Sequence, residues 1–380
     1  MVGTVISMLA AVGRDLSEQP ASFNGDDPAT APWAELMSVA DERYGHQQVS
    51  PALVSSAIVP LWAERCYLSA RLGPDLQFSA GRAVYPYGGR RTGYVAVSTG
   101  GAVHAVRARE PFTLGGDADD PQVGSVRIEV VRPLRELRIV LEDDDVPFGL
   151  DLRFEARGPV VPTDRNVIEI RGDVVTDYMN FFQSGWYSGT VTIDGVQRSI
   201  EPVLGFRDRG WGMRKHEGAP RRGLILFGAH EFPDYSLWYL LYETASGERV
   251  FTNGWLTSES EIIDTITGIE HDLDVDEHGL CTGGRMRFAC SSGLNRAFEF
   301  NVDARMYLAA GGYAPSQDWP LIGYTRHDTT DVDTVARLHG QNDNGGLCQL
   351  DGVAGHGFIE TGIGTHPQYQ PTSIPGGAKI

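Results

Sequence analysis

Apolar and polar side chains alternate with a period of two along most of the chain. Because successive side chains of a β-strand point to opposite faces, this pattern predicts strands with one buried face. Asp194-Gly195, between the alternating runs 189–193 and 197–200, predicts a two-residue hairpin turn. The clearest predicted strands cover residues 92–98, 125–131, 136–141 and 150–156.

Helical periodicity is scarce, so we predict an all-β fold with few short peripheral helices. Residues 159–176 interrupt the alternation with two prolines and several turn-forming residues, and we place a domain boundary at about residue 177. The halves 1–176 and 177–380 then each have the length of one antiparallel barrel or sandwich. The predicted helices cover residues 33–43, 51–57 and 258–265.

Composition and charge argue against several classes of function. The 380 residues carry a formal net charge of −18, which repels phosphate backbones and anionic membrane surfaces. The apolar run 5–12 is shorter than a bilayer span and lacks a preceding positive region, so we predict a cytoplasmic protein. The four cysteines show no metal-binding or disulfide-scaffold spacing, and we expect reduced thiols, no metal and no cofactor.

Residues 205–214, Gly-Phe-Arg-Asp-Arg-Gly-Trp-Gly-Met-Arg, crowd four charged side chains and a Trp among three glycines. Charged side chains are rarely buried unless they are paired, and glycine within a strand marks a bulge or a close approach of backbone or ligand. We therefore predict that Asp208 and Trp211 face a cavity.

The segment 207–214 resembles the Asp-His-Ser-Trp-Gly-Pro-Arg block of the lipocalin-like superfamily of carotenoid hydratases and fungal pericyclic cyclases related to tocopherol cyclase. Gly-His-Gly-Phe-Ile-Glu-Thr-Gly at 355–362 is similar to the closing strand of that superfamily, and Pro-Leu-Trp-Ala-Glu-Arg-Cys-Tyr at 60–67 resembles a strand of its two-domain bacterial branch. The resemblance covers about residues 50–365. Arg209 and Gly210 replace the family's His and Ser, and Met213 replaces its Pro, so the role of that His does not carry over.

The resemblance implies two lipocalin-like antiparallel barrels or sandwiches packed together, with a pocket lined by hydrophobic and aromatic side chains. Members hydrate alkenes or cyclise polyenes, which implies hydration, dehydration, isomerisation or cyclisation of an isoprenoid- or polyketide-like substrate. A shared fold does not by itself fix the reaction.

Asp208 is the predicted proton donor, because burial in an apolar cavity holds a carboxyl group protonated near neutral pH. Protonation of an alkene leaves a carbocation, which aromatic faces stabilise. Trp186, Tyr187 and Trp211 are the candidates for this role. The neighbouring arginines favour another interpretation, a structural Arg–Asp pair, and a simple ligand contact of Asp208 is also compatible with the pattern. Trp211 equally fits a plug in the floor of a barrel.

Further candidates lie in the segments that resemble the family. Gln183, His230 and His356 have side chains that would position a water molecule or a carbonyl group, although lone histidines in strands are usually core or rim residues. Pairing with an arginine explains Glu64 and Glu360 as well as substrate binding does. The predicted catalytic residues are Asp208, Trp211, His230 and His356, and the predicted substrate-binding residues are Gln183, Trp186, Tyr187, Arg214, Glu64 and Glu360.

The leading hypothesis is a cofactor-independent enzyme, a hydro-lyase, isomerase or cyclase, that acts on a hydrophobic small molecule. A non-catalytic carrier that uses the same apolar pocket is the alternative, and a protein-binding domain is a third. The expected partners are the hydrophobic substrate and, in a homodimer, a second copy of the chain. Nucleic acid and membrane insertion are not expected.

Overall fold

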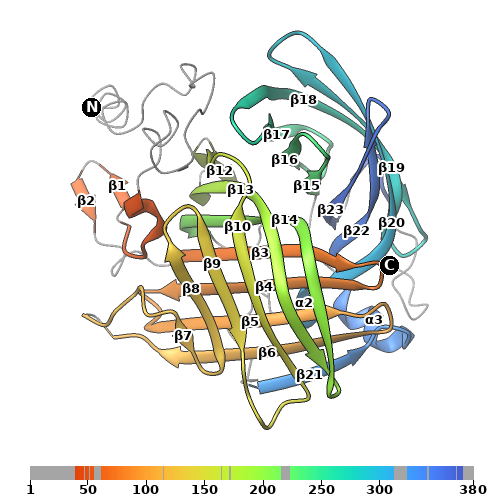
Figure 1. Cartoon of the computed structure of the whole chain (residues 1–380). Coiled ribbons are helices and arrows are strands. Elements are labelled where there is room, and N and C mark those ends of the chain that lie inside the picture. The colour runs from red at the N-terminus through yellow and green to blue at the C-terminus, as the bar shows by residue number, and fades with distance from the viewer. Residues whose placement is uncertain are drawn as a thin grey trace.

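The computed structural model describes residues 39–46, 48–50, 52–54, 61–113, 115–163, 165–170, 173–214, 223–311, 323–339, 342–364 and 366–370. Within these ranges the regular structure is almost entirely antiparallel β-strand, and the predicted all-β class is confirmed. The strands form a large curled sheet and a closed barrel that lie against each other (Figure 1).

The large sheet contains 13 strands, and its main path runs β21-β6-β5-β4-β3-β14-β13-β10-β9-β8-β7. Two short strands, β11 and β12, also pair with β13. The bounds are β3 Trp62–Gly73, β4 Leu76–Tyr85, β5 Arg90–Ser98, β6 Ala102–Pro111, β7 Gln122–Val123, β8 Val126–Arg132, β9 Glu136–Leu141, β10 Phe148–Ala156, β11 Val161–Pro162, β12 Asn166–Ile170, β13 Asp173–Ile193, β14 Val196–Arg214 and β21 Gly323–Asp328.

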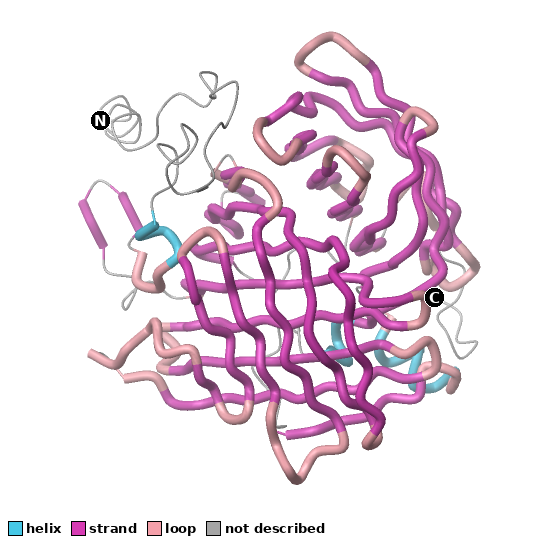
Figure 2. Tube along the Cα trace, viewed as in Figure 1, coloured by secondary structure: helices cyan, strands magenta, loops and turns pink. Residues whose placement is uncertain are grey.

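The barrel has eight strands and closes through pairing of its first strand with its last. The bounds are β15 Leu224–Glu231, β16 Ser236–Glu243, β17 Arg249–Thr257, β18 Ile262–Val275, β19 Cys281–Cys290, β20 Asn295–Tyr307, β22 Asn342–Leu350 and β23 Val353–Ile363. The remaining described elements are short: η4 Val39–Glu42, β1 Gln48–Ser50, β2 Ala52–Val54, α2 Leu308–Gly311 and α3 Val332–Leu338. In the tube view the helices are small pieces beside the strands (Figure 2).

The four clearest predicted strands are present as β5, β8, β9 and β10, with ends shifted by at most two residues, and the runs 189–193 and 197–200 are the hairpin ends of the longer strands β13 and β14. The hairpin turn is also confirmed, because Asp194 and Gly195 join β13 to β14 with φ values of 51° and 78°. Positive φ at both central residues is the requirement of the type I′ turn that Asp-Gly favours.

Two of the three helix predictions are wrong where the structure describes them, and the third is met only by a short 3-10 helix. Residues 258–261 form a turn in which Ser258 Oγ accepts the backbone N–H of Glu261, and β18 follows it. Residues 52–54 of the second predicted helix are strand, and the rest of that range lies outside the described residues. Of the first, 33–43, the described part holds one 3-10 turn, η4. The apolar run 5–12 lies outside the described residues.

The chain passes from the sheet to the barrel between Arg214 and Leu224, whereas the predicted boundary at 177 falls inside β13. The prolines that suggested this boundary mark short strands at the side of the sheet, since Pro162 lies in β11 and pairs with Phe181. Proline is tolerated in such positions because it lacks only the N–H that a central strand needs.

Three hydrophobic clusters fill the molecule. One lies within the curled sheet and one within the barrel, and the third joins the two. Alternation along β15 shows how the third arises: Leu224 and Leu226 belong to the barrel core, whereas Phe227 and Ala229 belong to the joining cluster. We call this third layer the sheet–barrel interface. Its aromatic members include Tyr67, Phe182 and Phe206 from the sheet and Phe227, Trp238 and Phe358 from the barrel.

Candidate active site at the sheet–barrel interface

Two hollows lie at the sheet–barrel interface. The first, the His356 hollow, is lined by residues of β3, β4, β14, β15, β22 and β23, among them Gln77, Phe206, Glu231, His356 and Phe358. The second, the Trp238 hollow, is lined by residues that include Phe182, Gln183, Ser184, Glu231, Ser236, Trp238 and Trp255. Both cavities are small, with volumes of about 20 and 30 Å³, and the surrounding free space amounts to about 320 and 360 Å³ only when open solvent is included.

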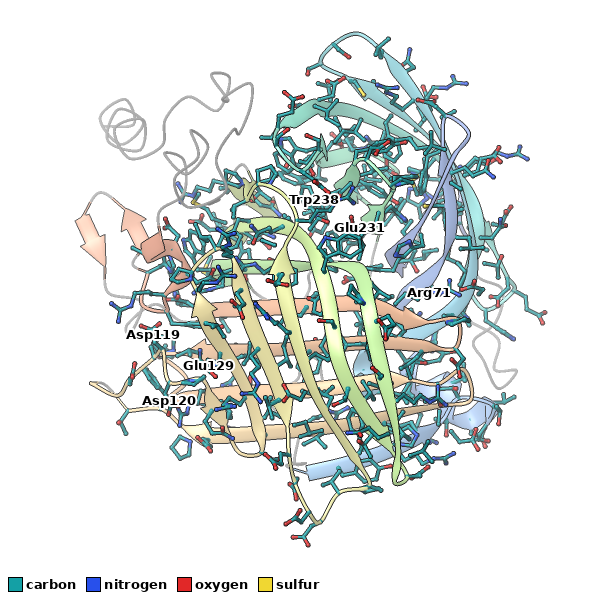
Figure 3. All side chains as sticks on the ribbon, in the orientation of Figure 1. Arg71, Asp119, Asp120, Glu129, Glu231 and Trp238 are labelled. Carbon is teal, nitrogen blue, oxygen red and sulfur yellow. The ribbon has the colours of Figure 1, made fainter. Side chains whose placement is uncertain are left out.

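Glu231 lines both hollows. It ends β15 on the strand face that points to the sheet, and its side chain lies close to Trp238 where the two layers meet (Figure 3). Only 4% of its surface is exposed. The hydroxyl groups of Ser184 and Ser236 donate to Glu231 Oε2 at 2.8 and 2.5 Å, and Arg157 Nη1 lies 3.6 Å from that oxygen.

Burial raises the pKa of Glu231 to about 7, although the two serine hydroxyls and Arg157 act in the opposite direction. Removal from water disfavours the charged form of a carboxyl group, and here this effect is the largest. A carboxyl group with a pKa near the ambient pH can both give and accept a proton, which is the property of an efficient general acid or base.

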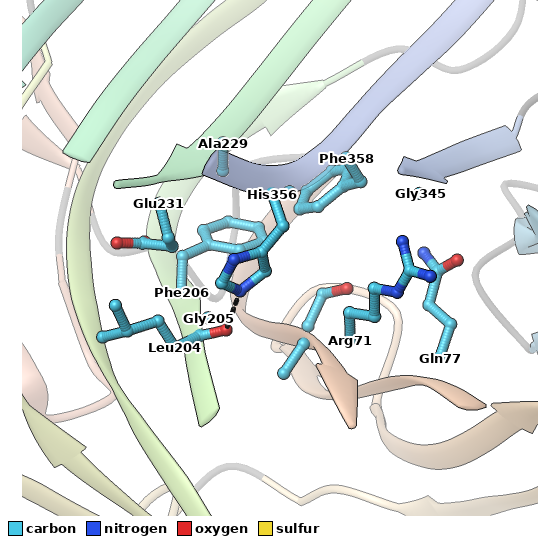
Figure 4. Close-up of a pocket in the computed structure, with 13 residues that line it drawn as sticks. Arg71, Gln77, Leu204, Gly205, Phe206, Ala229, Glu231, Gly345, His356 and Phe358 are labelled. Carbon is cyan, nitrogen blue, oxygen red and sulfur yellow. Dashed lines mark hydrogen bonds between the residues drawn. The ribbon is translucent and has the colours of Figure 1, made fainter. Parts of the chain in front are cut away.

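His356 stands beside Glu231, since the two residues are direct partners in the pairing of β23 with β15. Its Nε2 lies 3.4 Å from the carbonyl oxygen of Leu204, and burial lowers its pKa (Figure 4). Gln77 is buried in the same hollow, and its Oε1 has no hydrogen-bond donor among the described residues. The His356 hollow therefore combines an apolar wall with two side chains that can form hydrogen bonds.

Stacked aromatic rings form one wall of the Trp238 hollow. The rings of Phe182 and Trp238 have centroids 3.8 Å apart, and those of Trp238 and Trp255 are 4.9 Å apart with an interplanar angle of 21°. Trp238 and Trp255 are direct partners in the pairing of β16 with β17. A flat apolar surface of this kind suits a planar hydrophobic ligand.

A second buried acid lies in the same interface. Asp343 of β22 is completely buried, and the hydroxyl group of Tyr67 in the sheet donates to its Oδ2. Burial and the charge of Glu360, its direct partner on β23, raise the pKa of Asp343 well above its ordinary value. Asp343 thus lies in surroundings that favour its protonated form, and its hydrogen bond with Tyr67 links the barrel to the sheet.

The predicted site residues separate into groups. His356 lines the first hollow and Gln183 the second, and Glu360 lies beside Asp343. Gln183 is held by its own hydrogen bonds, since its amide donates to two backbone carbonyls and its Oε1 accepts from Arg207.

Asp208 is half-buried, and Asn180 Nδ2 lies 3.5 Å from its Oδ1. It is not among the described residues that line either hollow. The flanking arginines lie on the other face of β14. Arg207 forms a buried ion pair with Glu42 at 2.7 Å, and Arg209 forms one with Glu64 at 3.0 Å.

The arginine pairing explains Glu64, which is 1% exposed and also accepts from the backbone of Gly45 and contacts the His46 ring. These partners hold the pKa of Glu64 below its ordinary value against the opposing effect of burial. Trp211 is buried on the same side, and its ring stacks on His46 with centroids 3.9 Å apart. Both residues thus belong to the packing of the sheet against residues 39–46.

The remaining predicted residues lie away from the hollows. His230 points into the barrel, where its Nε2 is 3.4 Å from Tyr239 Oη, and burial lowers its pKa to about 3. Tyr187 is buried in the sheet core and donates to the carbonyl of Phe206, whereas Trp186 is 38% exposed. The side chain of Arg214 lies outside the described residues.

Glu231 was not among the predicted site residues, although His230 next to it was. The signal was present in residues 224–232, which are apolar on both faces of the predicted strand. A strand of this type is buried on both sides, so its single carboxylate has to be buried as well.

The chain belongs to a family of unknown function (DUF8625), whose model matches residues 38–304. Among solved structures, it is similar to an AttH protein from Nitrosomonas europaea, with 13% identity, a TM-score of 0.51, and coverage of 81% of this chain and 93% of the other. This likeness confirms the fold predicted from the resemblance. No curated protein matches the sequence.

Two weaker similarities have TM-scores below 0.5. Kievitone hydratase from Nectria haematococca gives 0.48 at 14% identity, with coverage of 80% of this chain and 89% of the other. CghA in complex with Sch210972 gives 0.46 at 13% identity, with coverage of 90% and 96%.

The described residues contain no group of three or more His, Cys, Asp or Glu side chains arranged to hold a metal ion. None of the helices in this part of the chain has the length and apolar character of a membrane span.

Proposed function

We propose that the protein is an enzyme that catalyses proton transfer on a hydrophobic small molecule at the sheet–barrel interface, in a reaction of the hydro-lyase, isomerase or cyclase type. The observation that supports this proposal most directly is the position of Glu231. It is a buried carboxyl group, it lines both hollows, and its pKa is raised to about 7.

Glu231 takes the role that the sequence suggested for Asp208. A proton donor has to lie within hydrogen-bond reach of the substrate, so its carboxyl group has to border the space in which the substrate binds. Glu231 borders both hollows. Ser184 from the sheet and Ser236 from the barrel fix its orientation from opposite sides of the interface.

The surroundings support a hydrophobic substrate. Phe182, Phe206 and Trp238 line the Trp238 hollow together with Glu231, and aromatic side chains of this kind bind apolar molecules and exclude water. Exclusion of water strengthens every electrostatic interaction within the site. Proton transfer balances without a redox partner, so a cofactor-independent reaction remains part of the proposal.

Glu231→Gln tests the proposal, with the exposed Glu270→Gln as the matched control. The probes are β-ionone, an isoprenoid enone, and trans-chalcone, a polyketide-like enone. Each is incubated with the protein in D₂O and followed by mass spectrometry for uptake of deuterium or of water. We expect conversion by the wild type, a loss of about 100-fold or more in Glu231→Gln, and no change in Glu270→Gln, because general acid–base groups contribute about this factor.

Two results would overturn the proposal. Equal conversion by the wild type and Glu231→Gln would remove Glu231 from the chemistry. Binding of both probes with the same affinity by the wild type and Glu231→Gln, without conversion of either, would instead establish the carrier.

A further inference from the structure

Two buried indole N–H groups of the Trp238 hollow lack a hydrogen-bond acceptor. Trp238 is 7% exposed and Trp255 is 2% exposed, and no described residue accepts from the Nε1 of either. A buried indole N–H usually finds a partner, because an unmade hydrogen bond in an apolar environment costs free energy. Both residues line the hollow, so a bound molecule is well placed to supply the acceptor.

The geometry points to a substrate that is a planar conjugated carbonyl compound, whose oxygen accepts from the indole N–H groups of Trp238 and Trp255. This inference rests on the proposed function and names its substrate class. The stacked rings of Phe182, Trp238 and Trp255 favour a flat molecule, whereas the two donors favour one with an oxygen acceptor.

The same arrangement defines a reaction. Ionised Glu231 removes the proton from the carbon next to the carbonyl group, the C–H bond breaks, and its electron pair moves onto the carbonyl oxygen to give an enolate. Donors aimed at an oxygen that gains negative charge stabilise it most strongly in a site without water. Return of the proton to another carbon completes an isomerisation.

A substrate with a hydroxyl group on the next carbon completes a dehydration instead. The enolate electron pair forms the new double bond, the C–O bond breaks, and the leaving hydroxide takes the proton from Glu231 as water. Both enolate reactions use the N–H edges of the two indole rings. Protonation of an isolated alkene would instead use the ring faces, which stabilise a carbocation. Carbonyl compounds and isolated alkenes are therefore the substrates of two different reactions.

The test compares 9-fluorenone with fluorene, a pair of flat probes that differ in the carbonyl group. The protein carries seven tryptophans and is labelled with ¹⁵N at their indole nitrogens. We expect fluorenone to move the Nε1–H resonances of Trp238 and Trp255 downfield and fluorene to leave them in place. Trp238→Phe and Trp255→Phe assign the two signals, and the exposed Trp186→Phe is the control.

Affinity gives the second readout. We expect the wild type to bind fluorenone about tenfold more tightly than fluorene, and the double variant Trp238→Phe/Trp255→Phe to reduce this preference to about twofold or less, as expected for loss of net hydrogen bonds. If fluorenone leaves both resonances unmoved, or if both probes shift them equally, the inference is overturned.

The two proposals fail separately. Fluorenone-specific shifts without Glu231-dependent conversion of any enone would leave the carbonyl site standing and overturn the proposed function. Glu231-dependent conversion without such shifts would do the reverse.

Discussion

Gly357 of β23 lies at a point where strand pairing leaves no space for a side chain. A Cβ atom there would approach the carbonyl oxygen of Ala229 to 2.2 Å and His230 Cα to 2.6 Å. These are backbone atoms of the paired strand, so the clash cannot be relieved by rotation of a side chain. We expect Gly357→Ala to lower the free energy of unfolding by about 2 kcal/mol, the usual scale for overpacking. Urea unfolding measures the change.

Gly362 on the same strand provides the control, because the nearest atom to its Cβ would be Ile225 Cβ at 3.8 Å, an ordinary contact. We expect Gly362→Ala to change stability by less than about 0.5 kcal/mol. Equal stability of the two variants would show that β15 and β23 can separate at Gly357 without cost.

The partners of the buried charged residues could not be predicted from the sequence. The charged block around Asp208 was predicted to face a cavity, yet its two buried arginines form ion pairs with Glu42 and Glu64. Both partners lie far away in the sequence, so nothing local assigns them. Glu231, in contrast, has no charged neighbour within its strand, and its raised pKa arises from the layer that packs on it.

At the scale of elements, η4 is joined to the sheet by one buried ion pair. Glu42 accepts from Arg207 at 2.7 and 2.9 Å and also from the backbone N–H of Leu134. Removal of one partner leaves the other charge buried and unpaired. We expect Arg207→Leu to destabilise the protein by about 3 to 5 kcal/mol in urea unfolding.

The double variant Arg207→Leu/Glu42→Leu separates this charge effect from lost packing. It removes both charges, and we expect it to regain much of the lost stability. The exposed pair of Arg285 with Glu299 is the control, and Arg285→Leu should change stability by about 0.5 kcal/mol or less. A double variant no more stable than Arg207→Leu would contradict this account.

Strands and their turns were the part of the fold that the sequence predicted best. Period-two alternation is a local signal, and Asp194-Gly195 fixes the register of β13 with β14 through a turn of two residues. The domain boundary, in contrast, depends on which strands pair, and this is not a local property of the sequence. β13 is 21 residues long and begins within the stretch 159–176, and its partners β10, β11, β12 and β14 come from before, within and after that stretch in the sequence.

At the scale of the whole molecule, the sheet–barrel interface makes stability depend on pH. Unfolded Glu231 ionises near its ordinary pKa of 4.5, whereas the folded protein keeps the proton up to a pKa of about 7. Folding therefore binds a proton between these pH values, and the contribution of Glu231 is fully present below about pH 4.5 and is lost as the pH rises to about 7. At about 1.4 kcal/mol per pKa unit, the loss is about 3 kcal/mol.

The neighbouring His230 acts with the opposite sign, and this permits a test within one strand. The pKa of His230 falls from 6.5 to about 3 on folding. Below about pH 6.5, the unfolded chain therefore binds a proton at His230 that the folded barrel does not bind. The test measures the free energy of unfolding of the wild type and of each variant across pH 4 to 8. The difference between the wild type and Glu231→Gln should decrease toward high pH, and the difference between the wild type and His230→Gln should decrease toward low pH. If the Glu231→Gln difference is flat with pH, its carboxyl group is ionised in the folded protein, and the proton-transfer role fails along with the stability argument. If the His230→Gln difference is flat, the barrel interior admits a charged imidazole, and burial at β15 is then too weak to explain the raised pKa on its other face.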